Sequence, residues 1–558
     1  MKPLSLFVAG AAGEGIQTVG DAVARAFLTH GYAAFSTSEF ESRIRGGRSS
    51  YRIRVADQPH NAPCATADVL LAVNPTAEAH YRSALNDGGL LITAGQGEDA
   101  DARSAVCVPF QELAVEHGGA RIYANAVAAG ALCAAVGLPL PVLQRVLADA
   151  FAARGEEIVH ANAASAKAGY DVALSQLGAQ APTGLPERPN RYTFASAHDV
   201  IPIAASAAGC RFIAAYPMSP STGIITSFAK DPELGVFFEQ AEDEIAAINM
   251  ALGASAAGAR AMTATSGGGF ALMVESVSLA GMMEIPIVIV LAQRPGPATG
   301  LPTRTAQEDL LFALHAGHGE FPRALLAPSD PQKTVEATVR AFDLADRYQI
   351  PVILLTDQFL ADSYFALEQL ALPPGPAKRH RAAPPSMEQY SRYLLTDSGV
   401  SPRLDLGQST HLVVLDSDEH TEAGHITEDL ERIRPAMVRK RLEKGRRLRE
   451  AMEQPEPDGA EQAEIVLIGW GSTRGAIDEA VAALRDRGAS IGSLHFTDVW
   501  PLPPLELRRD AQYWTVEGNA TGQFARLLRS ETGYSVEGTI ARYDGLPMDA
   551  ETIVRAFS

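Results

Sequence analysis

The spacing of apolar residues near the N-terminus predicts strands that alternate with helices. An apolar run, Leu4–Ala9, leads into a glycine-rich turn, and the apolar residues of Gln17–His30 then recur with the period of a helix. Asp68–Val73 is a second buried strand by the same criterion, and a helix of small residues is expected over Asn125–Val136. We therefore predict an α/β domain over residues 1–180, followed by a linker rich in Gly, Pro and polar residues.

Residues 191–370 contain continuous apolar runs instead of alternating ones. Strands are predicted at Phe212–Tyr216, Ile285–Leu291 and Ile350–Leu355, with helices at Glu242–Ala257 and Pro331–Arg347. Strands that are buried on both faces have such continuous runs, and their alternation with helices indicates a parallel, doubly wound sheet.

The last third of the chain begins with an irregular segment, residues 371–460, whose end is highly charged. Arg432–Met452 is predicted to form an exposed helix. A further α/β unit is expected over residues 461–558, with strands at Ile465–Ile468 and Gln512–Glu517. A chain of 558 residues is too long for one core, so the predicted fold class is α/β with several doubly wound domains.

The formal net charge of −19 limits the choice of partners. Such acidity argues against binding to nucleic acid or to anionic membrane surfaces. No apolar stretch approaches the length that spans a membrane. The short apolar run at the N-terminus faintly resembles a signal peptide, but it feeds a glycine-rich turn and an amphipathic helix, so a strand is the better interpretation.

The four cysteines, Cys64, Cys107, Cys133 and Cys210, are far apart in the sequence. No C-x-x-C pair exists, so the local spacing typical of iron–sulfur clusters and structural zinc is missing, and no metal site is predicted in this chain. A disulfide framework is equally unexpected. We predict free thiols in a reducing compartment, the cytoplasm.

Two loops near the N-terminus have the composition of anion-binding loops. The turn 10–15, Gly-Ala-Ala-Gly-Glu-Gly, lies between a strand and a helix, where backbone amides attract anions. Its spacing is not that of a dinucleotide-binding turn and Glu14 would repel a phosphate, so a plain tight turn explains it equally well. In the second loop, arginines beside paired glycines predict a site for phosphate or carboxylate, with a solvated polar turn as the alternative. The residues concerned are Arg43, Arg45, Gly46 and Gly47.

The segment 216–220, Tyr-Pro-Met-Ser-Pro, directly follows a predicted buried strand. In an open α/β sheet, ligands bind beyond the carboxyl ends of the strands. The two prolines fix the backbone, so that the hydroxyl groups of this turn project from a rigid support. A generic proline turn is the alternative, but it would not need the hydroxyls of Ser219, Ser221 and Thr222.

Two acidic residues, Glu242 and Glu244, stand at the head of a predicted helix of small residues. They either complement the helix dipole or hold a proton in a cofactor pocket. The turn Ser266-Gly267-Gly268-Gly269 follows the next strand and gives a ligand close access to the backbone.

The loop 293–305 is stiffened by three prolines and follows the strand Ile285–Leu291. Arg304 in this loop has the two parallel donors that clamp a carboxylate. A merely structural loop is the alternative.

In their order along the chain, these motifs resemble the α subunit of the 2-oxoacid:ferredoxin oxidoreductases. The resemblance continues in the segments Asp418–His425, Lys440-Arg441, Lys444, Gly471–Ala476 and Glu517–Gln523. Residues 1–180 resemble the γ subunit of the same family, so the resemblance covers nearly the whole chain as a γ–α fusion. Two departures stand out. The family's usual Tyr-Pro-Ile-Thr-Pro is Tyr-Pro-Met-Ser-Pro here, and the γ-like turn has Ala12 and Glu14 where glycine and glutamine are common.

The resemblance implies a domain organisation and a set of partners. Residues 191–370 would form a pyrimidine-type thiamine-diphosphate domain, 371–460 a connector, and 461–558 a domain like the C-terminal domain of transketolase. The chain has no Gly-Asp-Gly segment followed by Asn, which holds magnesium and diphosphate in thiamine enzymes. A β subunit is therefore expected to share the thiamine diphosphate and to contribute Mg²⁺ and a four-iron cluster. Coenzyme A would be the co-substrate, ferredoxin the electron acceptor, and a dimer of heterodimers the assembly.

The resemblance also implies roles for single residues. Glu242 is taken as the catalytic carboxylate, because it lies 24 residues before Ser266, a separation similar to that in other thiamine enzymes. Glu244 would then lie on another face of the same helix, at the surface. Arg304 and Ser219 are taken to hold the 1-carboxylate and the 2-oxo group of the substrate, and Thr303 is also assigned to substrate binding. The loop Arg43–Arg48 could meet the distal carboxylate of 2-oxoglutarate or the phosphates of coenzyme A. Cofactor binding is assigned to Tyr216, Pro217, Met218, Ser266 and Gly267.

The favoured reaction is the oxidative decarboxylation of 2-oxoglutarate to an acyl-CoA, with its direction in the cell left open, including reversal for CO₂ fixation. The same chemistry on pyruvate, a branched-chain oxoacid or indolepyruvate is the alternative. A nicotinamide dehydrogenase would need the G-x-G-x-x-G turn that is absent here. A non-catalytic scaffold subunit is a third alternative.

We expect the chain expressed without partner subunits to contain no iron–sulfur cluster, because its four scattered cysteines lack ligand spacing. Iron analysis and visible absorbance of the purified chain measure this. Stoichiometric iron held by these cysteines would contradict the prediction.

Overall fold

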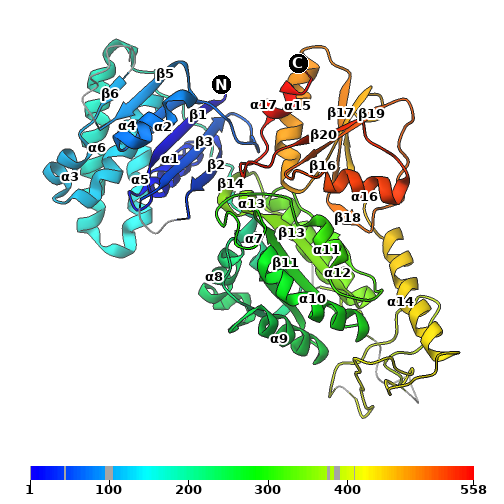
Figure 1. Cartoon of the computed structure of the whole chain (residues 1–558). Helices are drawn as coiled ribbons and strands as arrows, with labels where there is room; N and C mark the ends of the chain where they lie inside the picture. Colours follow the sequence, from blue (N-terminus) through cyan, green and yellow to red (C-terminus); the bar gives the residue numbers. More distant parts are fainter. Residues whose placement is uncertain are drawn as a thin grey trace. The chain divides into compact units, whose positions relative to one another are not determined.

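The computed structural model describes residues 2–42, 46–94, 105–373, 377–381, 390–407 and 409–557 (Figure 1). The chain forms two compact units. The first comprises Met1–Ala195, Asp362–Leu370 and Asp549–Glu551, and the second comprises Ser196–Ala361, Ala371–Met548 and Thr552–Ser558.

The first unit is built on an eight-stranded mixed sheet with the order β6-β5-β4-β1-β3-β2-β14-β7. Its strands are β1 Leu4–Ala11, β2 Ala33–Phe40, β3 Arg48–Ala56, β4 Ala67–Ala72, β5 Leu85–Thr93, β6 Ala105–Cys107, β7 Thr193–Ala195 and β14 Ser363–Leu367. Its helices are α1 Ile16–Thr29, α2 Pro75–Tyr81, α3 Phe110–Gly118, α4 Ala124–Val136, α5 Leu140–Phe151 and α6 Glu156–Leu177. The predicted first strand, α1 and α4 are confirmed, and the N-terminal apolar run is the buried strand β1.

The first unit extends beyond the boundary predicted at residue 180. Strand β14 pairs antiparallel with β2 through Phe365 and Phe35, and β7 pairs with the other edge of β14. Both strands lie in the segment 191–370, which the sequence assigned to the second domain. Local sequence patterns do not reveal that these strands belong to the first sheet, because strands of three and five residues are too short to show a long apolar run.

The second unit contains a seven-stranded sheet with the order β18-β12-β13-β11-β10-β8-β9. Its strands are β8 Cys210–Ala215, β9 Phe237–Gln240, β10 Arg260–Thr265, β11 Ile287–Gln293, β12 Ala324–Leu326, β13 Pro351–Asp357 and β18 Asp498–Trp500. Its helices are α7 Ala197–Ala207, α8 Thr222–Lys230, α9 Glu244–Ala256, α10 Gly267–Met282, α11 Leu310–His315, α12 Pro331–Tyr348 and α13 Gln358–Asp362. All pairs are parallel except β12 with β18, which confirms the predicted parallel sheet.

The C-terminal part of the second unit has a five-stranded sheet with the order β15-β17-β16-β19-β20. The strands are β15 Glu456–Asp458, β16 Ile465–Trp470, β17 Ile491–Phe496, β19 Gln512–Glu517 and β20 Gly538–Ala541, and the helices are α14 Ile433–Glu450, α15 Arg474–Asp486, α16 Gln523–Thr532 and α17 Ala550–Arg555. Strand β18 leaves this region to pair with β12. The two parts therefore share one compact unit and one apolar core cluster.

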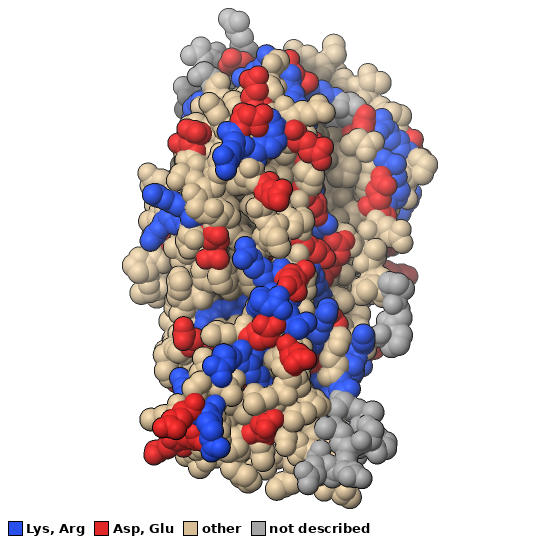
Figure 2. All heavy atoms as spheres, turned by 90° about the vertical axis from the view of Figure 1, so that its right-hand side faces the viewer, with Lys and Arg blue, Asp and Glu red and all other residues tan. Residues whose placement is uncertain are grey.

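Helix α14 is not the exposed helix that its charges predicted. Lys440 and Lys444 are buried, and both donate to the fully buried carboxylate of Glu284, at 2.6 Å and 2.7 Å. Burial opposes the ionisation of Glu284, but Lys444 and Lys440 outweigh it and lower the pKa of this carboxyl. The outward side chains of α14 pair among themselves, as Arg446 does with Glu443. On the face shown in Figure 2, basic and acidic side chains are likewise interspersed.

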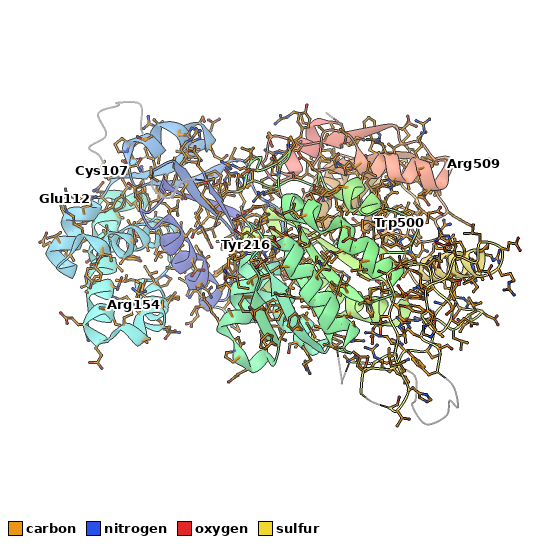
Figure 3. All side chains as sticks on the ribbon, turned by 60° about the horizontal axis from the view of Figure 1, so that its bottom comes forward. Cys107, Glu112, Arg154, Tyr216, Trp500 and Arg509 are labelled. Carbon is orange, nitrogen blue, oxygen red and sulfur yellow. The ribbon has the colours of Figure 1, made fainter. Side chains whose placement is uncertain are left out.

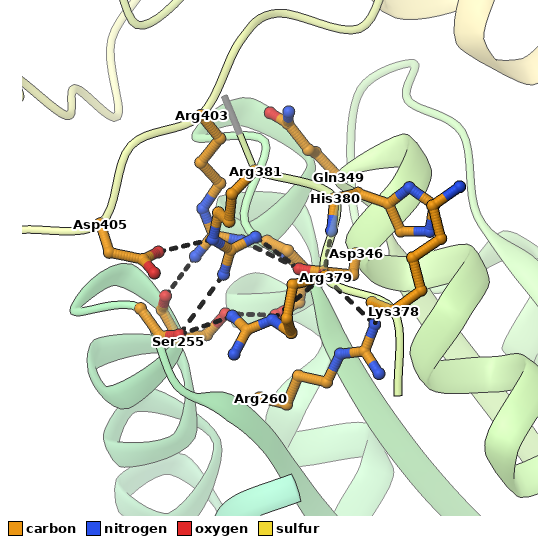
Figure 4. Close-up of polar contacts among 12 residues, drawn as sticks. Ser255, Arg260, Asp346, Gln349, Lys378, Arg379, His380, Arg381, Arg403 and Asp405 are labelled. Carbon is orange, nitrogen blue, oxygen red and sulfur yellow. Dashed lines mark hydrogen bonds and ion pairs between the residues drawn. The ribbon is translucent and has the colours of Figure 1, made fainter. Parts of the chain in front are cut away.

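A second buried charge cluster ties the connector to the parallel sheet (Figure 4). Asp346 on α12 accepts from Arg260, Arg379 and the backbone N–H of His380, and it also pairs with Arg381. Arg381 in turn contacts Asp405, at 2.6 Å. One buried carboxylate thus holds connector residues that are otherwise irregular.

The four cysteines differ in their exposure. Cys133 and Cys210 are buried thiols, whereas Cys64 and Cys107 are partly exposed, and all four are free.

Of the described helices, none alone is both long and apolar enough to cross a bilayer. One bent pair, Phe110–Gly118 with Arg121–Val136, meets the criteria of length and composition together.

We expect Asp346→Ala to lower the free energy of unfolding by about 3–5 kcal/mol, because it leaves several buried guanidinium groups without a counter-charge. Burial raises the pKa of Asp346, but the guanidinium groups, Arg381 first, outweigh burial and lower it to about 2. A depressed pKa in the folded state means that this stabilisation is complete above about pH 4 and is lost as the pH falls towards 2.

Urea unfolding of the wild type and the variant across this pH range measures both effects. Asp343→Asn is the matched control, because Asp343 lies on the same helix but is partly exposed and pairs with His380. Equal stability of Asp346→Ala and the wild type at neutral pH would contradict the prediction.

Candidate active site

Three of the predicted site loops leave the carboxyl edge of the parallel sheet. Strand β8 ends at Ala215, just before Tyr216; β10 ends just before Ser266; and β11 ends just before Arg294. Because these strands are parallel, the three loops leave the same edge of the sheet. Tyr216, labelled in Figure 3, is 38% exposed at this edge.

The start of α10 has no side chains of its own, and carboxyl groups lie against it. A Cβ atom added to Gly267 would lie 2.6 Å from Oδ2 of Asp309, and one added to Gly269 would lie 2.5 Å from Oε1 of Glu244. A side chain at either position would therefore displace the carboxyl group that lies against it. Ser266, the N-cap residue, makes no capping hydrogen bond with its side chain, and its Oγ is buried with no partner among the described residues.

Glu244, and not Glu242, is the carboxylate beside this turn. Glu244 is 3% exposed, and its Oε1 is buried with no hydrogen-bond partner in the described part of the chain. Glu242 is exposed and lies outside the helix. The expectation that Glu244 lies at the surface is wrong, because the side chain of Asp243 caps α9 and the helix therefore begins at Glu244.

Arg294 lies at the same edge of the sheet, and no role was predicted for it. Its Nη1 donates to the backbone carbonyl of Ser219, at 2.7 Å. Burial lowers the pKa of Arg294, and the nearby Asp309 acts in the opposite direction. The signal for Arg294 in the sequence is its position immediately after the apolar strand β11.

The turn after β8 departs in part from the prediction that its hydroxyl groups project outward, because the side chain of Ser221 points inward. Ser221 is buried and its Oγ donates to the carbonyl of Met218, at 2.8 Å. Ser219 is exposed, whereas Pro217 and Met218 are half-buried. The hydrogen bond from Ser221 therefore fixes the backbone of this turn on its buried side, while Ser219 and Tyr216 are exposed.

Arg304 and Thr303 are half-buried in the distal part of the 293–305 loop. Gly545 lies against the side chain of Arg304, and the N–H of Thr305 donates to the carbonyl of Gly545, at 3.2 Å. The C-terminal part of the second unit thus supports this end of the loop.

The two N-terminal loops with the composition of anion-binding loops differ in how far the structure describes them. Glu14 folds back on its own turn, where its carboxylate accepts from the N–H of Ala11 at 2.8 Å and from Nδ2 of Asn74 at 2.6 Å. This supports the interpretation of a tight turn. In the second loop, Arg43 and Arg45 lie outside the described residues. Gly46 and Gly47 have φ values of 71° and 80°, and anion binding by this loop stays a prediction.

Comparison with known proteins assigns a family to both parts of the chain. The family described as pyruvate flavodoxin/ferredoxin oxidoreductase, thiamine diphosphate-binding, matches residues 203–440. The family described as pyruvate ferredoxin/flavodoxin oxidoreductase matches residues 5–172.

The relatives match over almost the full length. Subunit alpha of 2-oxoacid:ferredoxin oxidoreductase 2 from Aeropyrum pernix is 30% identical, over 98% of this chain and 96% of the relative. The KorA subunit of 2-oxoglutarate oxidoreductase from Mycobacterium tuberculosis is also 30% identical, over 98% and 90%. The structure of 2-oxoglutarate:ferredoxin oxidoreductase from Magnetococcus marinus, with 2-oxoglutarate, coenzyme A and succinyl-CoA bound, has 31% identity and a TM-score of 0.92, and covers 100% of this chain and 99% of that one.

Proposed function

The chain belongs to the 2-oxoacid:ferredoxin oxidoreductases as an α subunit, and from this premise we propose that its substrate is 2-oxoglutarate. The observation that carries the proposal is the near-complete structural likeness to the Magnetococcus marinus enzyme, which binds 2-oxoglutarate and succinyl-CoA. The proposed reaction is oxidative decarboxylation to an acyl-CoA, with electrons passed to ferredoxin. Pyruvate, branched-chain oxoacids and indolepyruvate are the alternative substrates.

The geometry of the site fits the aminopyrimidine side of thiamine diphosphate. Glu244 has a buried carboxyl oxygen that lacks a partner among the described residues, and this oxygen lies against Gly269 at the start of α10. When bound, thiamine diphosphate supplies the nucleophilic carbon for the attack on a 2-oxoacid. The contribution of Glu244 is to hold a proton at the edge of the ring, in a site that is mostly dry.

Substrate binding is assigned to the two loops that Arg294 joins. We propose that Arg294 and Ser219 bind the 1-carboxylate and the 2-oxo group, because the Arg294 guanidinium already lies at the Ser219 turn. Arg304 and Thr303 follow in the same loop and are proposed to meet the distal carboxylate of 2-oxoglutarate. Tyr216, Pro217, Met218, Ser266 and Gly267 stay assigned to the cofactor.

The partner is proposed to be a β subunit that covers the outer faces of α9 and α10. Apolar side chains are exposed there, with Ile245 at 49%, Met250 at 43% and Leu272 at 51%. Exposed apolar clusters on helices beside a site mark interaction surfaces. The β subunit is proposed to bring Mg²⁺, the diphosphate site and the four-iron cluster, in a dimer of heterodimers in the cytoplasm. The Gly46–Gly47 loop is retained as a candidate for coenzyme A.

We expect Glu244→Gln to lower kcat of the assembled complex by about 10²–10⁴-fold, because the amide cannot hold the proton. Glu242→Gln is the matched control, since Glu242 is exposed two residues earlier, and it should retain activity. Steady-state kinetics with 2-oxoglutarate, coenzyme A and ferredoxin measure both. If Glu242→Gln lost activity and Glu244→Gln kept it, the original assignment to Glu242 would return.

The two arginines are expected to differ in substrate dependence. Arg294→Ala should lower kcat/KM for every 2-oxoacid by about 10–100-fold, the equivalent of a charged hydrogen-bonded contact of about 1.5–3 kcal/mol. Arg304→Ala should affect 2-oxoglutarate more than pyruvate, because only 2-oxoglutarate has a second carboxylate. A kinetic comparison of the two substrates tests this, and equal losses for both substrates in Arg304→Ala would remove Arg304 from the distal site.

A further inference from the structure

Asp309 places a second carboxyl group at the head of α10. Its Oδ2 is buried and has no hydrogen-bond partner among the described residues, and it lies against Gly267. A buried acceptor without a partner costs about 1–3 kcal/mol, so it persists where a ligand or a functional requirement compensates. The oxygen of Asp309 and that of Glu244 thus approach the same short stretch, Gly267–Gly269, from two different elements.

The C-terminal part of the second unit holds the loop of Asp309 on both sides. Gln307, two residues before Asp309, accepts from the N–H of Gly518 at 2.8 Å and donates to the carbonyl of Trp470 at 2.9 Å. Gln523, the first residue of α16, donates to the carbonyl of Glu308 at 2.6 Å and accepts from the N–H of Leu311 at 2.9 Å. Asp309 thus lies between Gln307 and Leu311, which are both held by hydrogen bonds to the C-terminal part.

The segment Glu517–Gln523, which holds this loop, is itself fixed by buried hydrogen bonds. The fully buried carboxylate of Glu517 accepts from the N–H groups of Phe524 and Ala525, at 2.8 Å and 3.0 Å, and so caps α16. The side-chain amide of Asn519 donates both to Glu517, at 2.9 Å, and to the carbonyl of Gln307, at 3.1 Å. The segment Glu517–Gln523 therefore uses its polar groups to position the loop of Asp309.

We propose that Asp309 is a further ligand-binding carboxylate of the active site, and that the segment Glu517–Gln523 positions it through Gln307 and Gln523. This proposal rests on the function proposed above. The ligand group is an N–H or O–H donor, which belongs either to the cofactor or to the 2-oxoacid as it reacts. Asp309 accepts this hydrogen bond in its ionised form.

The charges around Asp309 set the pH at which it can act. Burial, followed by the neighbouring Glu308, raises the pKa of Asp309 to about 6, while Arg294 acts in the opposite direction. Asp309 is therefore ionised at neutral pH, and its acceptor is lost as the pH falls through about 6. The charged groups on the elements around it are Glu308 of its own loop, Arg294 after β11, Glu244 of α9, Asp357 of β13 and Glu517 of β19.

The decisive variant is Asp309→Asn, tested in the assembled complex. We expect kcat/KM at neutral pH to fall by about tenfold or more, as for the loss of a charged hydrogen bond. The decline of wild-type activity below about pH 6 should disappear from the pH profile of the variant. If the ligand donor is on the cofactor, calorimetric titration with thiamine diphosphate alone will show weaker binding. If it is on the 2-oxoacid, cofactor affinity will be unchanged and the loss will be in the oxoacid kinetics. Unchanged kinetics, pH profile and cofactor affinity would overturn the proposal.

Asp498→Asn is the matched control for a general effect of a buried aspartate. Burial also raises the pKa of Asp498 to about 6. Asp498 lies on β18, far from the loop of Asp309 in the sequence, and it pairs with Arg340 at 2.7 Å. This control should lower Tm and leave the acid side of the pH profile in place.

The positioning role has its own variant, Gln523→Ala, with Gln512→Ala as control on the exposed start of β19. Gln523→Ala should lower kcat while keeping the decline of activity below about pH 6, because Asp309 is still present. Wild-type kcat in Gln523→Ala would overturn the positioning role. Absence of any 2-oxoacid turnover by the wild-type complex would instead refute the proposed function. An active wild type, an inactive Glu244→Gln and a normal Asp309→Asn would refute this inference alone.

Discussion

The organisation of the second unit depends on the approach of two carboxyl groups to a helix start that has no side chains. Gly267 and Gly269 allow Asp309 and Glu244 to come within distances that any Cβ atom would block. The N-terminus of α10 carries the positive end of the helix dipole, which favours negative charge at this place. The glycines therefore determine where buried acids are tolerated, and the strands β8, β10 and β11 bring the remaining groups to the same edge.

Buried charge also holds the less regular parts of the chain. The connector has few long apolar runs, and Asp346 attaches it through arginines, while Glu284 attaches α14 through two lysines. Such clusters need every partner in place, because an unpaired buried charge is much more costly than a lost apolar contact. They fix orientation in segments that apolar packing alone would leave poorly defined.

The candidate site is assembled from several elements. The proline-containing turn after β8 presents Ser219, the loop after β11 presents Arg294, and α9 presents Glu244. The C-terminal part of the unit contributes hydrogen bonds to the loop of Asp309, at Gly518 and Gln523. The polar residues of the segment Glu517–Gln523 make these hydrogen bonds, although the carboxylate of Glu517 is fully buried.

The sequence alone determined the central strands of the parallel sheet and the family. Continuous apolar runs predicted the parallel strands β8, β11 and β13, because burial on both faces leaves a strong local signal. The ordered motifs at Tyr216, Ser266 and Glu517 identified the family, whose membership the full-length relatives then showed. Local patterns could also place α14, since its length and composition are those of a helix.

Tertiary structure decided which side chains meet. Glu242 and Glu244 are equivalent in the sequence, and only the cap formed by Asp243 determines which one is buried. Arg294 reaches the turn after β8 because β8 and β11 both pair in parallel with β10, so that their carboxyl ends lie at the same edge of the sheet. The charges of α14 predicted exposure, yet Lys440 and Lys444 are buried because Glu284 lies opposite them. In each case the partner is 24 or more residues away or is set by a helix boundary, and the hydrophobic period along the chain contains no information about such contacts.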